Sequence, residues 1–210
     1  MTSFLTRAAA VLATTLACAF APSTYAGSAG DALSLLDKTT LNGRIDAVVD
    51  VYAPPEKNGQ SGKHERYPAQ VAFERPDRFR ISIRPGQKNE YRAVAEAGIV
   101  RWLDFATGWS GKAEVDRVTD PLALALLGTA GELQQHAEIK DLPQAKGSTL
   151  VGARLSPRVL IGELSDGLVW IGDDGQPIGF EFRFADGGKV FVSVLRLERN
   201  IPLSKDEFAL

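Results

Sequence analysis

Residues 71–83 read VAFERPDRFRISI, two apolar runs separated by a polar break. In the second run, Phe79–Ile83, apolar and polar residues alternate, so the apolar ones share one face of an extended strand. Pro76 lacks an amide hydrogen and biases the preceding residue, Arg75, toward extended backbone, so the chain leaves one strand here and enters the next. The stretch therefore predicts a hairpin in an antiparallel sheet with one buried and one solvated face.

The N-terminus has the organisation of a secretory signal peptide. A single cation, Arg7, precedes an apolar stretch from Ala8 to Ala21, and the segment after it ends in the small residue Ala26. The apolar stretch is shorter than the roughly 20 residues that a transmembrane helix needs. We expect residues 1–26 to be a signal peptide for export to the periplasm, cleaved after Ala26. The alternative is a lipoprotein anchored at Cys18, which follows a loose lipobox.

Composition limits what the mature chain can be. Cleavage would remove 26 of the 210 residues and leave 184, enough for a single domain at 27–210 with its own core. Cys18 is the only cysteine, so the mature chain has no disulfide. Loss of Arg7 leaves 23 basic and 26 acidic residues, a net charge of −3 that argues against nucleic acid as a partner. We expect a monomer without a membrane span after signal removal.

Short strands and tight turns dominate the rest of the chain. A helix is expected at Asp31–Leu41, and Asp173-Asp174-Gly175 and Asp186-Gly187-Gly188 are expected to be hairpin turns. At this strand count a twisted antiparallel sheet tends to curl, which predicts an α+β fold with a single large curled sheet. The expected strands are residues 44–52, 71–73, 79–83, 90–96, 99–105, 109–115, 149–155, 159–164, 168–171, 178–184 and 190–197.

A short helix that is apolar all round is predicted at Pro121–Leu127. Asp120 can cap it, Pro121 suits its first position, and Gly128 can end it. Such a helix needs burial on several sides, and a lid over the curled sheet would provide it. Another helical turn is expected at Glu132–Ala137. The apolar lid residues are Leu122, Leu124, Leu126 and Leu127.

The concave face of a curled sheet has two interpretations. With a helix packed into it, it is an ordinary hydrophobic core; with the helix displaced, it becomes a volume lined by apolar side chains that could hold an acyl chain. The residues themselves leave both open. The candidate lining residues are Phe73, Phe79, Ile81, Trp102, Phe180, Phe182 and Phe184.

Residues 73–80, FERPDRFR, resemble the arginine-proline block of the periplasmic outer-membrane lipoprotein carrier family, the LolA-like fold. Residues 98–104, GIVRWLD, are similar to the family's next motif, and residues 195–203 together with Phe208 resemble its closing strand and tail. The helix at 120–128 lies where the family has its lid. Together these motifs span most of the mature chain.

The resemblance implies a half-open β-barrel with short helices over its concave face. It implies a carrier or chaperone in outer membrane biogenesis that binds lipoprotein acyl chains or other lipids in a hydrophobic cavity, without a cofactor. Inner-membrane donor and outer-membrane acceptor proteins would then be its partners. By position, the family arginine that hydrogen-bonds the closed lid corresponds to Arg75, which is the implied lid latch.

Each of these roles has an ordinary structural alternative. Arg75 fits equally well as a surface arginine beside a turn, and a solvated outer face is favoured for Arg78, Arg80 and Arg84 over contacts with lipid phosphates. Core packing is the simpler expectation for Trp102, Trp109 and Trp170.

Catalytic chemistry is not expected. The two histidines, His64 and His136, have no second ligand at metal spacing, and nucleophile elbows and phosphate-binding glycine loops are missing from the sequence. The remaining alternative is a non-enzymatic periplasmic adaptor with a solid core, whose exposed strand edges recruit a protein partner by strand addition.

Overall fold

The computed structural model describes residues 28–55, 62–114, 137–144, 146, 148, 150–158 and 164–210. Within them lie one α-helix, one short 3-10 helix and eleven strands. The helices are α2 (Ala29–Thr39) and η2 (Lys205–Phe208). The strands are β1 (Asn42–Tyr52), β2 (His64–Glu74), β3 (Arg78–Ile83), β4 (Tyr91–Glu96), β5 (Ile99–Asp104), β6 (Ser110–Glu114), β7 (Ala137–Asp141), β8 (Val151–Pro157), β9 (Leu164–Ile171), β10 (Pro177–Phe184) and β11 (Lys189–Arg199).

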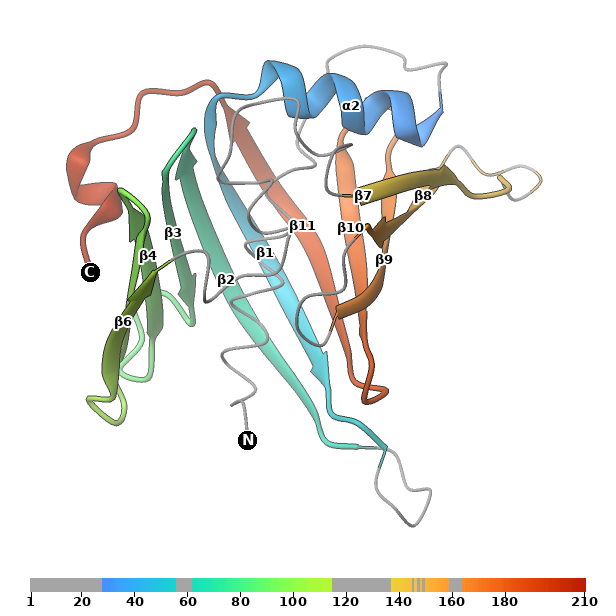
Figure 1. Ribbon diagram of the computed structural model, residues 1–210. Helices are drawn as coiled ribbons and strands as arrows, with labels where there is room; N and C mark the ends of the chain where they lie inside the picture. The colour runs from blue at the N-terminus through green and yellow to red at the C-terminus, as the bar shows by residue number, and fades with distance from the viewer. Residues whose placement is uncertain are drawn as a thin grey trace.

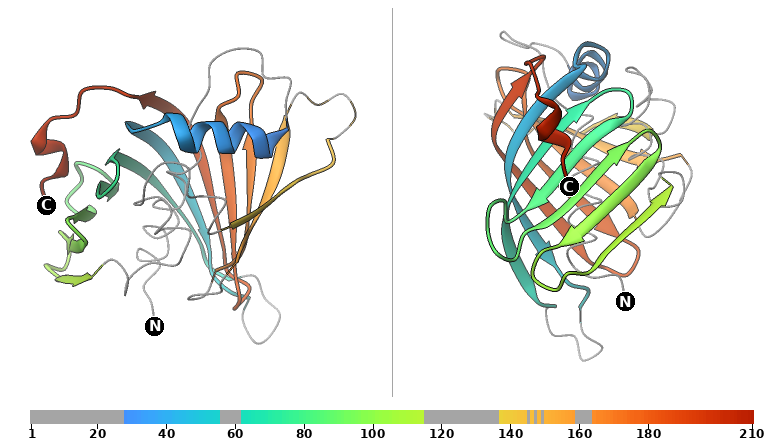
Figure 2. Two further views of the ribbon diagram at one scale, coloured as in Figure 1. Left: turned by 45° about the horizontal axis from the view of Figure 1, so that its top comes forward. Right: turned by 90° about the vertical axis from the view of Figure 1, so that its left-hand side faces the viewer.

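All eleven strands belong to one antiparallel sheet. Their order is β6-β5-β4-β3-β2-β1-β11-β10-β9-β8-β7, so the first and last strands of the chain pair in the middle. β6 and β7 follow each other in the sequence and form the two opposite edges. The sheet curls but does not close, as Figure 1 and the two views of Figure 2 show. This confirms the predicted half-open barrel.

The hairpin predicted at residues 71–83 is present. Phe73 pairs with Phe79 and Val71 with Ile81, on a face where all four side chains are buried. Pro76 lies in the turn between β2 and β3, where it interrupts no strand hydrogen bond. The alternation of apolar and polar residues thus predicts the buried face correctly.

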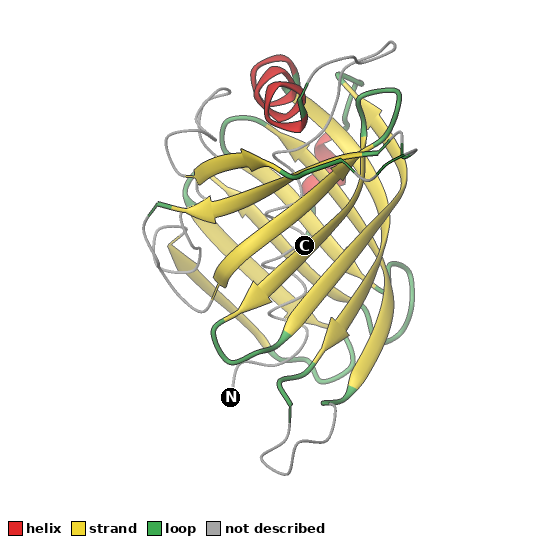
Figure 3. Cartoon of the chain, turned by 90° about the vertical axis from the view of Figure 1, so that its right-hand side faces the viewer, coloured by secondary structure: helices red, strands yellow, loops and turns green. Residues whose placement is uncertain are grey.

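Both glycine turns in the last third are also confirmed. Gly175 and Gly187 have φ values of 73° and 87°, in the left-handed region that glycine adopts without steric cost. Backbone hydrogen bonds close each turn, from Gly175 to Gly172 and from Gly187 to Phe184. These two turns set the order of β9, β10 and β11 in the sheet (Figure 3).

Helix α2 lies across one end of the sheet (Figure 1). Ser28 caps it by accepting a hydrogen bond from the Asp31 N–H, and Leu33 is buried in the hydrophobic cluster of the sheet. The Gly30 N–H donates to the Asp141 carboxylate of β7 at 2.8 Å, which ties the helix start to an edge strand. The helix ends before the predicted Leu41.

The structure differs from the sequence prediction in two further places. β7 was not predicted, and Ala137, expected to end a helical turn, begins this strand. β9 begins at Leu164 and is longer than the predicted strand at 168–171. The signal peptide, the helix at 121–127 with Leu122, Leu124, Leu126 and Leu127, and most of the strand at 159–164 lie outside the described residues.

The C-terminal tail packs on the outer, convex face of the sheet (Figures 1 and 2). Phe208 of η2 is only 5% exposed and forms a small cluster with Ala72 of β2, Val94 of β4 and Leu203. The Arg78 guanidinium lies 4.3 Å from the centre of the Phe208 ring, a cation–π contact. One aromatic side chain therefore anchors the tail across β2, β3 and β4.

Phe208→Ala is expected to lower the free energy of unfolding by about 2 kcal/mol, because it exposes Ala72 and Val94 and removes one buried aromatic ring. Urea denaturation followed by circular dichroism measures the change. Leu210→Ala in the same tail is the matched control, since Leu210 is exposed and its loss should change stability by no more than about 0.5 kcal/mol. Equal stability of the two variants would contradict the anchoring role of Phe208.

Candidate functional site

A continuous apolar surface covers the inner, concave face of the sheet. Ile45, Val71, Ile81, Ala93 and Trp102 are register partners in turn across β1, β2, β3, β4 and β5. On the other side of β1 the surface continues through β11 to β10 and β9, and all of these residues belong to one hydrophobic cluster. The two halves of the sheet therefore share a single apolar face rather than two separate cores.

Every residue proposed from the sequence as cavity lining lies on this face. Phe73, Phe79, Ile81, Phe180 and Phe182 are buried within the cluster. Trp102 and Phe184 are partly buried and pack against it. Phe180 and Phe182 stack with their ring centres 6.2 Å apart. The structure thus brings together side chains that lie more than 100 positions apart in the sequence.

One end of the concave face is polar. Tyr91 and Asp104 are register partners there, and burial, with the Asp104 charge in support, raises the pKa of Tyr91 to about 12. Tyr67 lies on the same face of β2, two residues before Ala69, the partner of Ile83. The sequence prediction began this strand at Val71 and so missed Tyr67, although the alternation continues upstream to it.

The three tryptophans have three different environments. The Trp102 indole lies over Gly111 of β6, where a Cβ atom would approach it to 2.4 Å, so only glycine permits this packing. Trp109 contacts Trp102 at 5.6 Å between ring centres but is 53% exposed on the β5–β6 hairpin, contrary to the core expectation. Trp170 pairs with Gly179, on the face of β10 opposite to Phe180.

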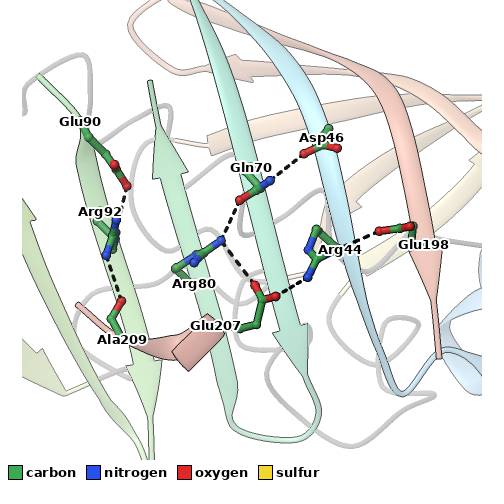
Figure 4. A network of polar contacts seen from close by, with 9 residues as sticks. All are labelled: Arg44, Asp46, Gln70, Arg80, Glu90, Arg92, Glu198, Glu207 and Ala209. Atoms are coloured by element: carbon green, nitrogen blue, oxygen red, sulfur yellow. Dashed lines mark hydrogen bonds and ion pairs between the residues drawn. The ribbon is translucent and has the colours of Figure 1, made fainter. Parts of the chain in front are cut away.

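The convex face carries a network of charges under the C-terminal tail (Figure 4). Glu207 of η2 pairs with Arg44 and, at 3.7 Å, with Arg80. Arg80 also donates to Gln70 at 2.7 Å, and Gln70 donates to Asp46 at 2.9 Å. Burial lowers the pKa of Arg80, and the nearby Glu207 carboxylate partly opposes this. The same face holds a polar groove of about 480 Å³ between these residues and Glu198.

The predicted outer arginines divide into two groups. Arg78 and Arg80 are engaged by protein carboxylates, since Arg78 pairs with Glu74 at 2.7 Å and with Glu96 at 3.2 Å. Arg84 instead lies over the ring of Tyr67, with 4.2 Å from its guanidinium carbon to the ring centre. Arg78 and Arg80 therefore stabilise the outer face, and Arg84 belongs to the polar end of the inner one.

The predicted latch, Arg75, lies in the turn directly after β2. Its backbone N–H donates to the Leu41 carbonyl at 2.8 Å, and its side chain is partly buried. The leucines of the predicted lid lie outside the described residues, as does His136. His64 lies on the convex face, 2.8 Å from an Asp50 carboxylate oxygen and stacked on Tyr52.

The described part of the chain holds neither a cluster of metal-binding side chains nor a helix that could cross a membrane. Among those residues, histidine, cysteine, aspartate and glutamate side chains do not gather in a group of three or more that could hold a metal ion. None of the helices formed by those residues has both the length and the apolar character needed to cross a bilayer.

Glu90→Gln is expected to make stability less dependent on pH in the acid range. Burial raises the pKa of Glu90, but hydrogen bonds from Arg92, the Gly86 N–H and Ser82 outweigh it and hold the pKa below the ordinary value. A carboxylate with a depressed pKa stabilises the fold at pH values above the ordinary glutamate pKa. This contribution is lost as the pH falls through the pKa of the group in the folded state.

The free energy of unfolding of the wild type should therefore exceed that of Glu90→Gln by about 2 kcal/mol at pH 7, and this difference should shrink toward pH 3. Urea denaturation at both pH values measures it. Glu138→Gln, at a half-exposed ion pair with Lys140, is the control and should change stability little at either pH. A difference that stays constant with pH would show that the Glu90 charge has no such effect.

Comparison with known proteins gives only distant structural similarities. No family model matches the chain, and no curated protein matches it. A LolA superfamily protein from Nitrosomonas europaea is 11% identical, with a TM-score of 0.46 over 88% of this chain and 99% of that one. An outer membrane lipoprotein-sorting protein domain from Vibrio parahaemolyticus is 7% identical, with a TM-score of 0.43 over 83% and 92% of the two chains.

The MucA/MucB complex of Pseudomonas aeruginosa matches at 14% identity, with a TM-score of 0.42 over 87% of this chain and 59% of that one. At these scores the similarities carry no argument about function, and the description of the fold rests on the strand pairing itself. At the level of the fold, the chain is distantly similar to these proteins.

Proposed function

We propose that the protein is a periplasmic carrier. It holds the acyl chains of lipoproteins or other lipids against the concave face of its sheet, keeps them from water, and delivers them toward the outer membrane. Carriage of this kind involves no catalytic step. The signal peptide expected at residues 1–26 and the motifs at 73–80 and 98–104 support this proposal from the sequence.

The observation that carries the proposal is the apolar concave face of an open sheet. An apolar row crosses the five consecutive strands β1 to β5, and on the other side of β1 the apolar face continues to phenylalanines of β10. Burial of one methylene group contributes about 0.8 kcal/mol, so an acyl chain against such a surface is held tightly. Release then requires an element that competes for the same surface.

The lid is the proposed competitor. In this proposal Leu122, Leu124, Leu126 and Leu127 cover the concave face when no lipid is bound, and Arg75 holds the lid closed. The place of Arg75 directly after β2, at the end of the sheet where Leu41 enters β1, suits a latch at the rim of the concave face. Displacing the lid offsets part of the binding free energy, so that cargo can leave.

One observation also fits a second candidate, a protein-binding adaptor with a solid core. The concave residues are already buried in the free chain, with Val71, Ile83 and Phe182 fully so. A core packed to this extent would leave no volume for an acyl chain, and partner binding would then use the outer surface or a strand edge. The two functions predict opposite results when a larger side chain is added to the concave face.

Ala93→Leu is the discriminating variant, because Ala93 lies on the concave face between Ile81 and Trp102. In a carrier the added side chain fills space that lipid would occupy, so lipid uptake falls at least tenfold while stability stays within about 1 kcal/mol of wild type. Titration with a fluorescent fatty acid and urea denaturation provide the two measurements.

Ser193→Leu, at an exposed position on β11, is the control and should leave lipid uptake unchanged. The carrier would be excluded and the adaptor favoured by two results together. The wild type would take up no fatty acid, and Ala93→Leu would be destabilised by about 1 to 3 kcal/mol.

Arg75→Leu tests the latch separately. Loss of the latch should favour the open lid, so the variant exported to the periplasm should retain more bound lipid than the wild type. Native mass spectrometry of both proteins, followed by lipid extraction, measures the difference. Identical lipid content in the two proteins would refute the latch but leave the carrier proposal standing.

A further inference from the structure

Tyr67 carries a buried hydroxyl group that no part of the described structure satisfies. The side chain is 4% exposed and belongs to the apolar cluster of the concave face. Its hydroxyl has no hydrogen-bond partner among the residues that the structure describes. A buried donor without a partner is destabilising, and native proteins tolerate few of them without a functional reason.

Arg84 adds a positive charge to the same place. Its guanidinium lies 4.2 Å from the centre of the Tyr67 ring, and it donates to the backbone carbonyl of Asn89 rather than to a carboxylate. Arg84 also has a φ of 57°, in the left-handed region that a residue other than glycine adopts at some cost. A hydrogen bond from its N–H to the Pro68 carbonyl on β2 holds it there.

A second unsatisfied donor lies on the same face of the sheet. The indole Nε1 of Trp102 is buried and has no hydrogen-bond partner within the described chain. Trp102 pairs with Ala93 in the middle row of the face, three strands away from Tyr67, so the two donors do not form one site. Tyr91 and Asp104, paired with each other across β4 and β5, are the further polar groups at the end that holds Tyr67. At the other end the face continues as Phe73, Phe79, Ala95 and Val100, which carry no polar side-chain atoms.

On β2 to β5 the concave face is therefore polarised along the strands, with the unsatisfied Tyr67 hydroxyl and Arg84 at one end and hydrocarbon at the other. We propose that this polar end recognises the ester carbonyl of an acylated lipid, with Tyr67 Oη–H as the donor and the chains lying toward Phe73 and Phe79. The inference rests on the proposed carrier function and specifies its ligand: an acyl ester rather than plain hydrocarbon.

The chemistry of the donors selects the ester. Tyrosine offers a neutral O–H group, which suits an uncharged carbonyl oxygen. A site with buried donors discriminates against an analogue without the acceptor, because those donors then stay unsatisfied. An ether-linked lipid with the same chain is such an analogue, since it keeps the apolar contacts and lacks only the carbonyl.

The test compares monopalmitoylglycerol with its ether analogue, hexadecylglycerol, as competitors of a fluorescent fatty acid bound to the exported, delipidated protein. The wild type should bind the ester about fivefold more tightly than the ether, which corresponds to one hydrogen bond. Tyr67→Phe removes only the hydroxyl and should abolish this preference by weakening ester binding and leaving ether binding unchanged. Without lipid the variant should unfold at the same or a higher temperature, because it loses an unsatisfied buried group.

Tyr52→Phe is the matched control, since it removes a hydroxyl from an exposed tyrosine on the convex face. It should keep the wild-type preference for the ester. Equal binding of ester and ether by the wild type, or an unchanged preference in Tyr67→Phe, overturns the ester inference while the carrier proposal stands. Failure of both lipids to bind the wild type overturns the carrier proposal and this inference together.

Arg84 distinguishes the two sources of an acyl ester, a phospholipid and an acylated lipoprotein. Binding of phosphatidylglycerol and of diacylglycerol with the same chains is measured for the wild type and for Arg84→Gln. Selective loss of phosphatidylglycerol binding supports a phosphate-bearing ester, because the guanidinium then contacts the phosphate. Equal binding of both lipids by wild type and variant supports an ester without phosphate. Loss of the ester preference for monopalmitoylglycerol in Arg84→Gln overturns the assignment of that preference to Tyr67.

Discussion

The pairing of β1 with β11 is the constraint on which the rest of this structure depends. These strands are the first and last of the sheet in sequence, and their contact joins a half made of β2 to β6 with a half made of β7 to β10. The edges β6 and β7 do not pair with each other, so the sheet stays open. An open, curled sheet has one large concave face, and the apolar side chains of both halves meet there.

The two faces of the sheet use different physical interactions. On the concave face, stability comes from burial of aliphatic and aromatic side chains, with little hydrogen bonding between them. On the convex face, arginines and glutamates of neighbouring strands form ion pairs, and the tail joins this network through Glu207 while Phe208 fills an apolar site between the charges. The tail thereby stabilises the outer side of β2, β3 and β4, and the inner side of the same strands remains apolar.

The polar end of the concave face gives the proposed site a direction. Tyr67 holds a buried donor without a partner in the described residues, and Arg84 is kept beside it in a left-handed conformation. None of these features helps the sheet to form, since a phenylalanine at position 67 would pack on the same face without an unsatisfied hydroxyl. They are understandable as adaptations to a ligand that has hydrocarbon at one end and acceptor oxygens at the other.

Local alternation determined much of this protein from the sequence. Phe79 and Ile81, or Phe180 and Phe182, were assigned to a buried face because residues two apart on a strand point the same way, and the glycine turns followed from backbone sterics. The sequence did not reveal β7, which has few apolar residues and becomes a strand through its pairing with β8. It also did not reveal that Tyr67 lies beside Arg84, that Trp170 faces outward, or that Glu207 pairs with Arg44 and Arg80. These depend on which strands become neighbours, and that is decided only when the whole chain buries its apolar faces together.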